Sequence, residues 1–115
     1  MHFICEKEKI LKGINSVING VSNKTTMPIL EGILIQTNDN EIKLTSYDLE
    51  IGIEYILEAD IKEQGNTVVN AIMFSEIIRK LPNSNIQIKI NFYKNIVLRN
   101  KGLQKIFKLI YLQRL

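Results

Sequence analysis

Two hydrophobic periods divide the chain into segments. Between residues 6 and 20, apolar residues recur at offsets of one, three and four, which predicts an amphipathic helix that Gly20 ends. A second helix is predicted where Phe74, Ile77, Ile78 and Leu81 share one face. Asn70 can cap the start of this helix, and the segment PNS at 82–84 stops it. The two apolar faces predict that both helices pack against other elements.

The remaining segments alternate apolar and polar residues with a period of two, which is typical of strands. Residues 38–40 (NDN) and 46–48 (SYD) mark turns. Residues 51–61 have an apolar residue at every second place, which predicts one long two-faced antiparallel strand. The full set of predicted strands is 2–5, 30–37, 42–45, 51–61, 67–69, 86–90, 96–98 and 106–112.

The order of these elements repeats once. It is strand, helix and three strands, followed by a second strand, helix and three strands. This order predicts a duplicated β-α-β-β-β unit within a single domain of residues 1–115, although the halves share no obvious identity. We expect an α+β fold with two helices on one face of antiparallel sheet. A chain of this size can bury a core without disulfides or metals.

Charge is distributed unevenly along the chain. The net charge is +3, but residues 1–93 carry −3 and residues 94–115 carry +6, and no Asp or Glu follows Glu76. The basic balance therefore gives only weak support for nucleic-acid binding. No apolar run approaches the about 18 residues of a membrane span, and charges at residues 6–9 replace a signal-peptide core. One cysteine, Cys5, excludes an internal disulfide, so we expect a cytoplasmic protein.

The residues needed for catalysis are scarce. His2 is the only histidine and lies within the first predicted strand, which disfavours a nucleophile–histidine pair. Cys5 is interpreted as a small core residue, and Asp48 and Glu50 as a turn residue and an exposed carboxylate. Neither zinc-ligand spacing nor a Gly-rich phosphate loop occurs. We therefore expect no enzyme activity, no metal and no cofactor.

Four segments, together with Phe3 and the following helix start at residues 6–11, resemble a known family. They are KTTMPIL at 24–30, LTSYDLE at 44–50, FSEIIRKLP at 74–82 and FKLIYL at 107–112. In this order they are similar to the N-terminal domain of the bacterial DNA sliding clamp, the DNA polymerase III β subunit. The resemblance implies a DNA-clamp domain whose helices line a ring around duplex DNA. It also implies a non-catalytic processivity factor that holds DNA without sequence preference.

The resemblance implies candidate contacts on two surfaces. DNA contacts would come from four basic residues: Lys24 in the loop before Pro28, Lys12 on the first helix, and Arg79 and Lys80 at the second helix. The alternative for each is an ordinary exposed basic residue. Phe107 and Leu109 correspond to the apolar pair on the family's intersubunit edge, so the 106–112 strand would contact clamp subunits. The alternative for this strand is a core strand packed on both faces.

The chain departs from the family in two places. Ile72 and Met73 stand where the family often has a basic residue, and the chain stops before the second and third clamp domains. In the family, the third domain carries the pocket for polymerase and clamp-loader peptides. Because the chain stops before both domains, we expect a truncated or frame-disrupted clamp. An alternative is a stand-alone protein that caps a clamp edge by strand pairing through 106–112. A ferredoxin-like nucleic-acid binder and an enzyme with an unrecognised site are further alternatives.

Overall fold

The computed structural model describes residues 1–20, 32–47, 50–90 and 95–108, with only the backbone described at residues 107 and 108. The helices are α1 (Lys7–Val17), which continues into a short 3-10 turn (Ile18–Gly20), and α2 (Ala71–Arg79). The strands are β1 (His2–Glu6), β2 (Gly32–Asn38), β3 (Glu41–Tyr47), β4 (Gly52–Glu58), β5 (Asp60–Glu63), β6 (Asn66–Asn70), β7 (Asn85–Ile90), β8 (Asn95–Asn100) and β9 (Leu103–Lys108).

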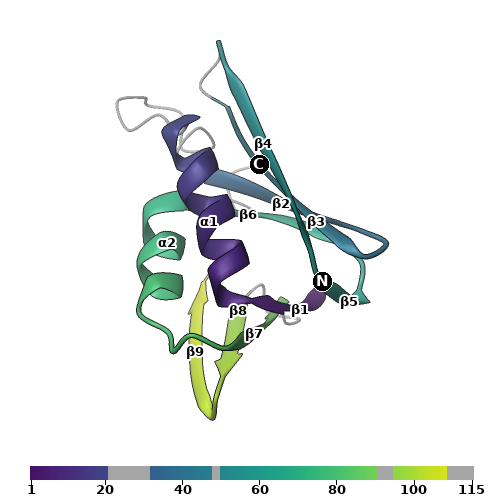
Figure 1. The fold of residues 1–115 in the computed structure, drawn as a ribbon, viewed down its shortest axis with the longest axis vertical. Coiled ribbons are helices and arrows are strands. Elements are labelled where there is room, and N and C mark those ends of the chain that lie inside the picture. Colours follow the sequence, from purple (N-terminus) through teal and green to yellow (C-terminus); the bar gives the residue numbers. More distant parts are fainter. Residues whose placement is uncertain (21–31, 48–49, 91–94, 109–115) are drawn as a thin grey trace.

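The strands form two antiparallel sheets, with the orders β5-β1-β7-β8-β9 and β4-β3-β2-β6. The duplicated β-α-β-β-β order is confirmed, with β5 as an extra strand at the end of the first half, and the first strand of each half joins the sheet of the other half. β1 pairs with β7 of the second half, and β6 pairs with β2 of the first. α1 and α2 lie side by side next to the sheets (Figure 1). The two halves therefore interlock rather than fold as separate units.

The predicted long strand at 51–61 is wrong in one respect, because the chain changes sheet at Ala59. β4 pairs with β3 in the four-stranded sheet, whereas β5 pairs with β1 in the five-stranded sheet. The Ala59 N–H donates to the Asn40 carbonyl at 3.0 Å, which satisfies the backbone at the bend. Alternation of apolar residues continues through such a bend, so the period alone does not reveal it.

The last described strand begins earlier than predicted. β9 starts at Leu103 rather than at residue 106, and residues 109–112 of the predicted strand lie outside the described residues. β8 and β9 are joined at Lys101 and Gly102, which have φ values of 47° and 84°. Two consecutive residues with positive φ are typical of a tight hairpin turn.

The core lies between the helices and the sheets. The predicted apolar faces are confirmed: Ile10, Ile14 and Val17 of α1 are fully buried, as are Phe74 and Ile78 of α2. Asn70 caps α2 as predicted, since its side-chain oxygen accepts from the Met73 N–H at 2.9 Å. The helices therefore turn their polar faces outward. Neither described helix is long and apolar enough to cross a membrane.

Candidate nucleic-acid interface

The outer faces of α1 and α2 form one surface, which we call the helix surface. Amphipathic helices place their polar residues opposite the core, and these positions face solvent here. Its exposed residues are Glu8, Lys9, Lys12, Asn15 and Asn19 on the first helical segment, and Ile72, Glu76, Arg79 and Lys80 on the second. The predicted contacts Lys12, Arg79 and Lys80 thus belong to one surface.

These three cations are available for an anionic ligand. No carboxylate of the described residues forms an ion pair with Lys12, Arg79 or Lys80. Arg79 is the last residue of α2 and Lys80 caps it, a placement that suits the negative end of the helix dipole. Glu8 and Glu76 on the same surface leave only a small positive excess. Lys24 lies outside the described residues, so its role stays a prediction.

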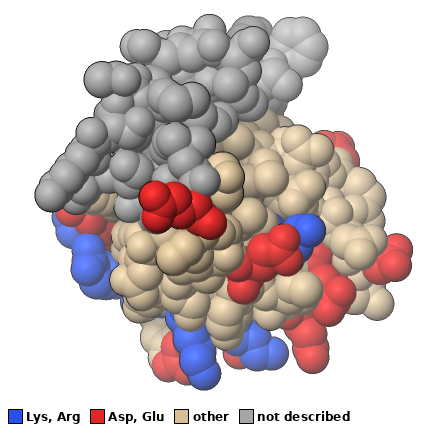
Figure 2. Space-filling view, turned by 90° about the horizontal axis from the view of Figure 1, so that it is seen from above, with Lys and Arg blue, Asp and Glu red and all other residues tan. Residues whose placement is uncertain are grey.

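Charges of both signs are interspersed on the molecule. Figure 2 shows basic side chains toward the left and lower edges of the face seen from above and also right of its centre, with acidic ones among them and across the centre and right. A surface of mixed charge attracts phosphates weakly, and phosphate binding there depends on a few local cations. Strong binding by a single copy of this domain is therefore not expected.

Lys7 has a structural role that its sequence pattern does not reveal. A lysine off the apolar face of an amphipathic helix is typical of a solvated position. The Lys7 side chain is instead partly buried, and its ammonium donates to the carbonyls of Arg79 at 3.0 Å and Leu81 at 2.7 Å. These partners lie 72 and 74 residues further along the chain. No local pattern connects positions so far apart, so sequence analysis missed this contact.

The second candidate surface is the β9 edge of the five-stranded sheet. β9 pairs only with β8 among the described strands, so its described part is an edge strand of the sheet. Leu103 and Ile106 on this edge are 48% and 57% exposed. Phe107 lies opposite Ile96 in the backbone register, and Leu109 lies outside the described residues. The interface roles of Phe107 and Leu109 remain predictions.

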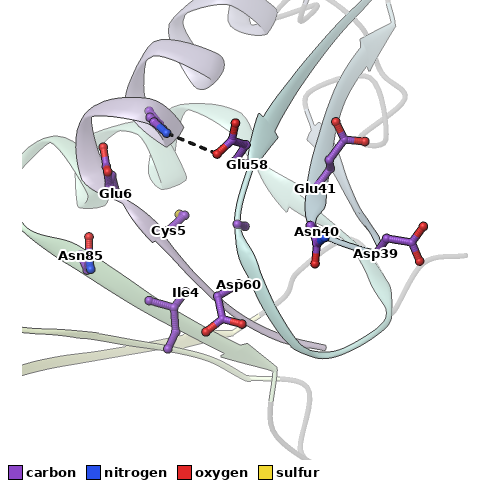
Figure 3. Close-up of a pocket in the computed structure, with 11 residues that line it drawn as sticks. Ile4, Cys5, Glu6, Asp39, Asn40, Glu41, Glu58, Asp60 and Asn85 are labelled. Carbon is purple, nitrogen blue, oxygen red and sulfur yellow. Dashed lines mark ion pairs between the residues drawn. The ribbon is translucent and has the colours of Figure 1, made fainter.

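One groove on the described surface is acidic. It lies where the start of α1 meets the β2–β3 turn and the β4–β5 bend (Figure 3). Its carboxylates come from Glu6, Asp39, Glu41, Glu58 and Asp60, and the only ion pair drawn there joins Lys9 to Glu58 at 4.0 Å. No group of ligands suited to a metal ion occurs among the described residues. This groove repels phosphates, so it lies outside the candidate interface.

Two residues considered for chemistry, Cys5 and His2, have pKa values shifted by their surroundings. Burial, with a smaller effect from Glu6, raises the pKa of the Cys5 thiol to about 12, so the thiol stays protonated. The pKa of His2 is lowered, mainly by burial and then by Lys89, so the imidazole is neutral at pH 7. The burial of Cys5 and its protonated thiol agree with its interpretation as a core residue.

Comparisons with known proteins cover almost the whole chain. The family model described as "DNA polymerase III beta subunit, N-terminal domain" matches residues 1–113. The beta sliding clamp of Bacillus subtilis is 34% identical over 111 residues, which cover 89% of this chain and 29% of that protein.

Solved structures agree with the sequence comparisons. A putative DNA polymerase III beta subunit from Eubacterium rectale has a TM-score of 0.90 at 40% identity, over 95% of this chain and 30% of that one. The Bacillus subtilis clamp has a TM-score of 0.91 at 27% identity, over 99% of this chain and 32% of that one. This chain therefore spans about a third or less of the relatives that it matches.

Proposed function

This chain belongs to the family of the DNA polymerase III beta subunit, N-terminal domain, and we propose that it works as the N-terminal domain of a sliding clamp. In that role it contributes to a non-catalytic, sequence-independent DNA tether for a polymerase. The observation that carries the proposal is the match over residues 1–113, together with the fold shared with a relative of 40% identity. The resemblance recognised from the sequence is confirmed.

Because the chain spans only 29% of the Bacillus subtilis relative, the activity of a whole clamp is itself a proposal. A single domain cannot encircle a duplex. We therefore assign this domain one segment of a ring, with its helix surface toward DNA and its strand edges toward neighbouring clamp segments. Contacts with a polymerase and a clamp loader would belong to a complete ring.

The DNA contact is proposed for Lys12, Arg79 and Lys80 of the helix surface, with Lys24 as a fourth cation. Lysine and arginine bind phosphate oxygens regardless of base sequence, which suits a protein that slides. The support is that the first three are exposed and without a carboxylate partner among the described residues. Uncharged polar positions on this surface, such as Asn15, would lie toward DNA without adding charge.

The contact with other clamp subunits is proposed for the β9 edge, including Phe107 and Leu109. An open strand edge offers unpaired backbone groups to a strand of another subunit. Exposed Leu103 and Ile106 add apolar area on this edge. The sheet could therefore continue across a subunit boundary, with the apolar residues covered by the partner.

The DNA contact is tested by the salt dependence of binding to a short duplex, measured by fluorescence anisotropy. Each phosphate contact contributes about −0.9 to the slope of log K against log salt concentration. The double variant R79Q/K80Q should lower affinity and flatten the slope by about 1.8, equally for two unrelated sequences. Lys62→Gln is the control, since Lys62 lies on β5 and pairs with Asp60 at 2.9 Å.

Two results would contradict the DNA contact. One is an unchanged affinity of R79Q/K80Q, and the other is tight binding that survives high salt.

The β9 contact has its own test, which is binding to a full-length clamp subunit measured by analytical ultracentrifugation. Ile106→Glu should abolish that binding while leaving DNA binding intact, and equal binding by this variant would refute the β9 assignment.

A further inference from the structure

We propose that Lys7 is a positioning residue for the basic pair Arg79–Lys80, and that it acts by fixing the C-terminal end of α2 rather than by touching DNA. This inference rests on the proposed DNA contact of Arg79 and Lys80. It goes beyond that contact by naming a residue from the other half of the fold that prepares the pair for phosphate binding.

The geometry around Lys7 supports this role. The last carbonyls of a helix lack partners within the helix, and a lysine ammonium can satisfy them. Lys7 does so for two carbonyls, that of Arg79, the last residue of α2, and that of Leu81, just after the cap. Two of its three N–H donors are therefore committed, and its positive charge lies at the negative end of the α2 dipole.

Further hydrogen bonds hold the segment that follows α2. The Lys7 backbone N–H donates to the Ser84 carbonyl at 3.2 Å, and the Asn83 side-chain amide donates to the Glu8 carboxylate at 2.8 Å. Asn100, which is only 2% exposed, donates from Nδ2 to the carbonyls of Pro82 and Asn85 at 3.2 and 3.0 Å. Residues 79–85 are thus pinned from α1 and from the end of β8.

Pinning this segment matters because Arg79 and Lys80 occupy the helix end, where the last turn frays most readily. A long basic side chain loses rotamer entropy when it contacts a phosphate, and a fraying backbone adds to that loss. Lys7 removes the backbone part of this cost before DNA arrives. Its loss should therefore weaken DNA binding only through Arg79 and Lys80.

A double-mutant cycle on the full chain separates this role from two others. The variants are Lys7→Met, R79Q/K80Q and their combination, each measured for affinity to a short DNA duplex at low salt. Lys7→Met should lower affinity about threefold to tenfold in the parent chain and have no effect in the R79Q/K80Q background. Lys7→Arg should restore binding, because a guanidinium can also donate to carbonyls.

Lys9→Met is the matched control for the exchange measurement, since Lys9 is an exposed lysine on the same helix whose ion pair with Glu58 is only a 4.0 Å contact. Hydrogen exchange provides a readout without DNA. The Lys80 and Leu81 amides donate to the carbonyls of Glu76 and Ile78. Their hydrogen-exchange rates should rise in Lys7→Met and stay the same in Lys9→Met.

The outcomes distinguish the inference from the proposed function. An effect of Lys7→Met that persists at full size in the R79Q/K80Q background would overturn the inference alone, because Lys7 would then act independently of the pair. Unchanged exchange at Lys80 and Leu81 would also overturn it. If R79Q/K80Q binds DNA as well as the parent chain, the proposed DNA contact fails and the inference fails with it.

Discussion

Gly13→Ala tests how closely α1 approaches the four-stranded sheet. Replacing glycine with alanine inside a helix normally stabilises it by about 1 kcal/mol. At Gly13 an added Cβ would lie 2.8 Å from Tyr55 Cδ1 and 3.0 Å from Leu44 Cδ1. Carbon atoms pack best at about 3.5–4.0 Å, so both side chains would have to shift by roughly half an ångström or more.

The magnitudes decide the sign of this change. Overpacking of a dense core costs about 1–3 kcal/mol, which exceeds the gain in helix propensity. We expect a net loss of about 1 kcal/mol in the free energy of unfolding, or roughly 4 °C in Tm for a domain of this size. Urea denaturation followed by circular dichroism measures the first quantity, and a thermal scan measures the second.

Asn15→Ala is the matched control for Gly13→Ala. Asn15 is exposed on the same helix, so it gains propensity without a new contact and should stabilise by about 0.5 kcal/mol. In a Tyr55→Ala background the clash at 2.8 Å disappears, and the cost of Gly13→Ala should fall by at least about 1 kcal/mol. A Gly13→Ala variant as stable as Asn15→Ala would refute the close approach of α1 to β4.

Three further predictions concern polar contacts. Asn70→Ala removes the cap on the Met73 N–H and should cost about 1 kcal/mol, whereas Asn70→Ser should retain most of it in the same urea titration. Asn100→Asp turns a buried donor into an acceptor facing carbonyls, so it should cost at least about 3 kcal/mol at neutral pH. Burial raises the pKa of the new carboxyl, so this loss should shrink as pH falls, and a constant loss would argue against burial. The pKa of Glu63 is lowered by the hydrogen bond and charge of the Met1 ammonium at 2.8 Å. The ion pair of Glu63 with the Met1 ammonium should therefore stabilise the fold fully above the ordinary glutamate pKa of 4.5. The Tm of the parent chain should exceed that of Glu63→Gln at such pH values, and this difference should vanish below the lowered pKa.

The parts of the fold that depend on local periodicity could be predicted. The faces of both helices, the Asn70 cap and the order of the strands follow from residues a few positions apart. The bend at Ala59 could not be predicted, because β4 and β5 keep one alternation while their partners, β3 and β1, belong to different sheets. The choice of sheet is decided by pairing partners far apart in the sequence.

The candidate interface likewise contains residues that could be predicted from the sequence and residues that could not. Arg79 and Lys80 could be proposed from the resemblance and from their place at the end of a predicted helix, and both prove exposed. Lys7 and Asn100 could not, because a lysine in a first helical turn is typical of a solvated position, and an asparagine before Lys101–Gly102 is typical of a turn. Their partners, the carbonyls at 79–85, are recognisable only once the chain is folded.

The exchange of first strands between the halves explains why the helix surface needs both of them. β1 leads directly into α1, and its pairing with β7 places Lys7 beside the end of α2. β6 leads directly into α2, and its pairing with β2 anchors the start of that helix in the sheet of the first half. Each helix is therefore held at its N-terminal end by the other half of the chain. The basic pair at the end of α2 and Lys12 on α1 keep a fixed spacing because the two halves cannot move apart without breaking sheet pairs.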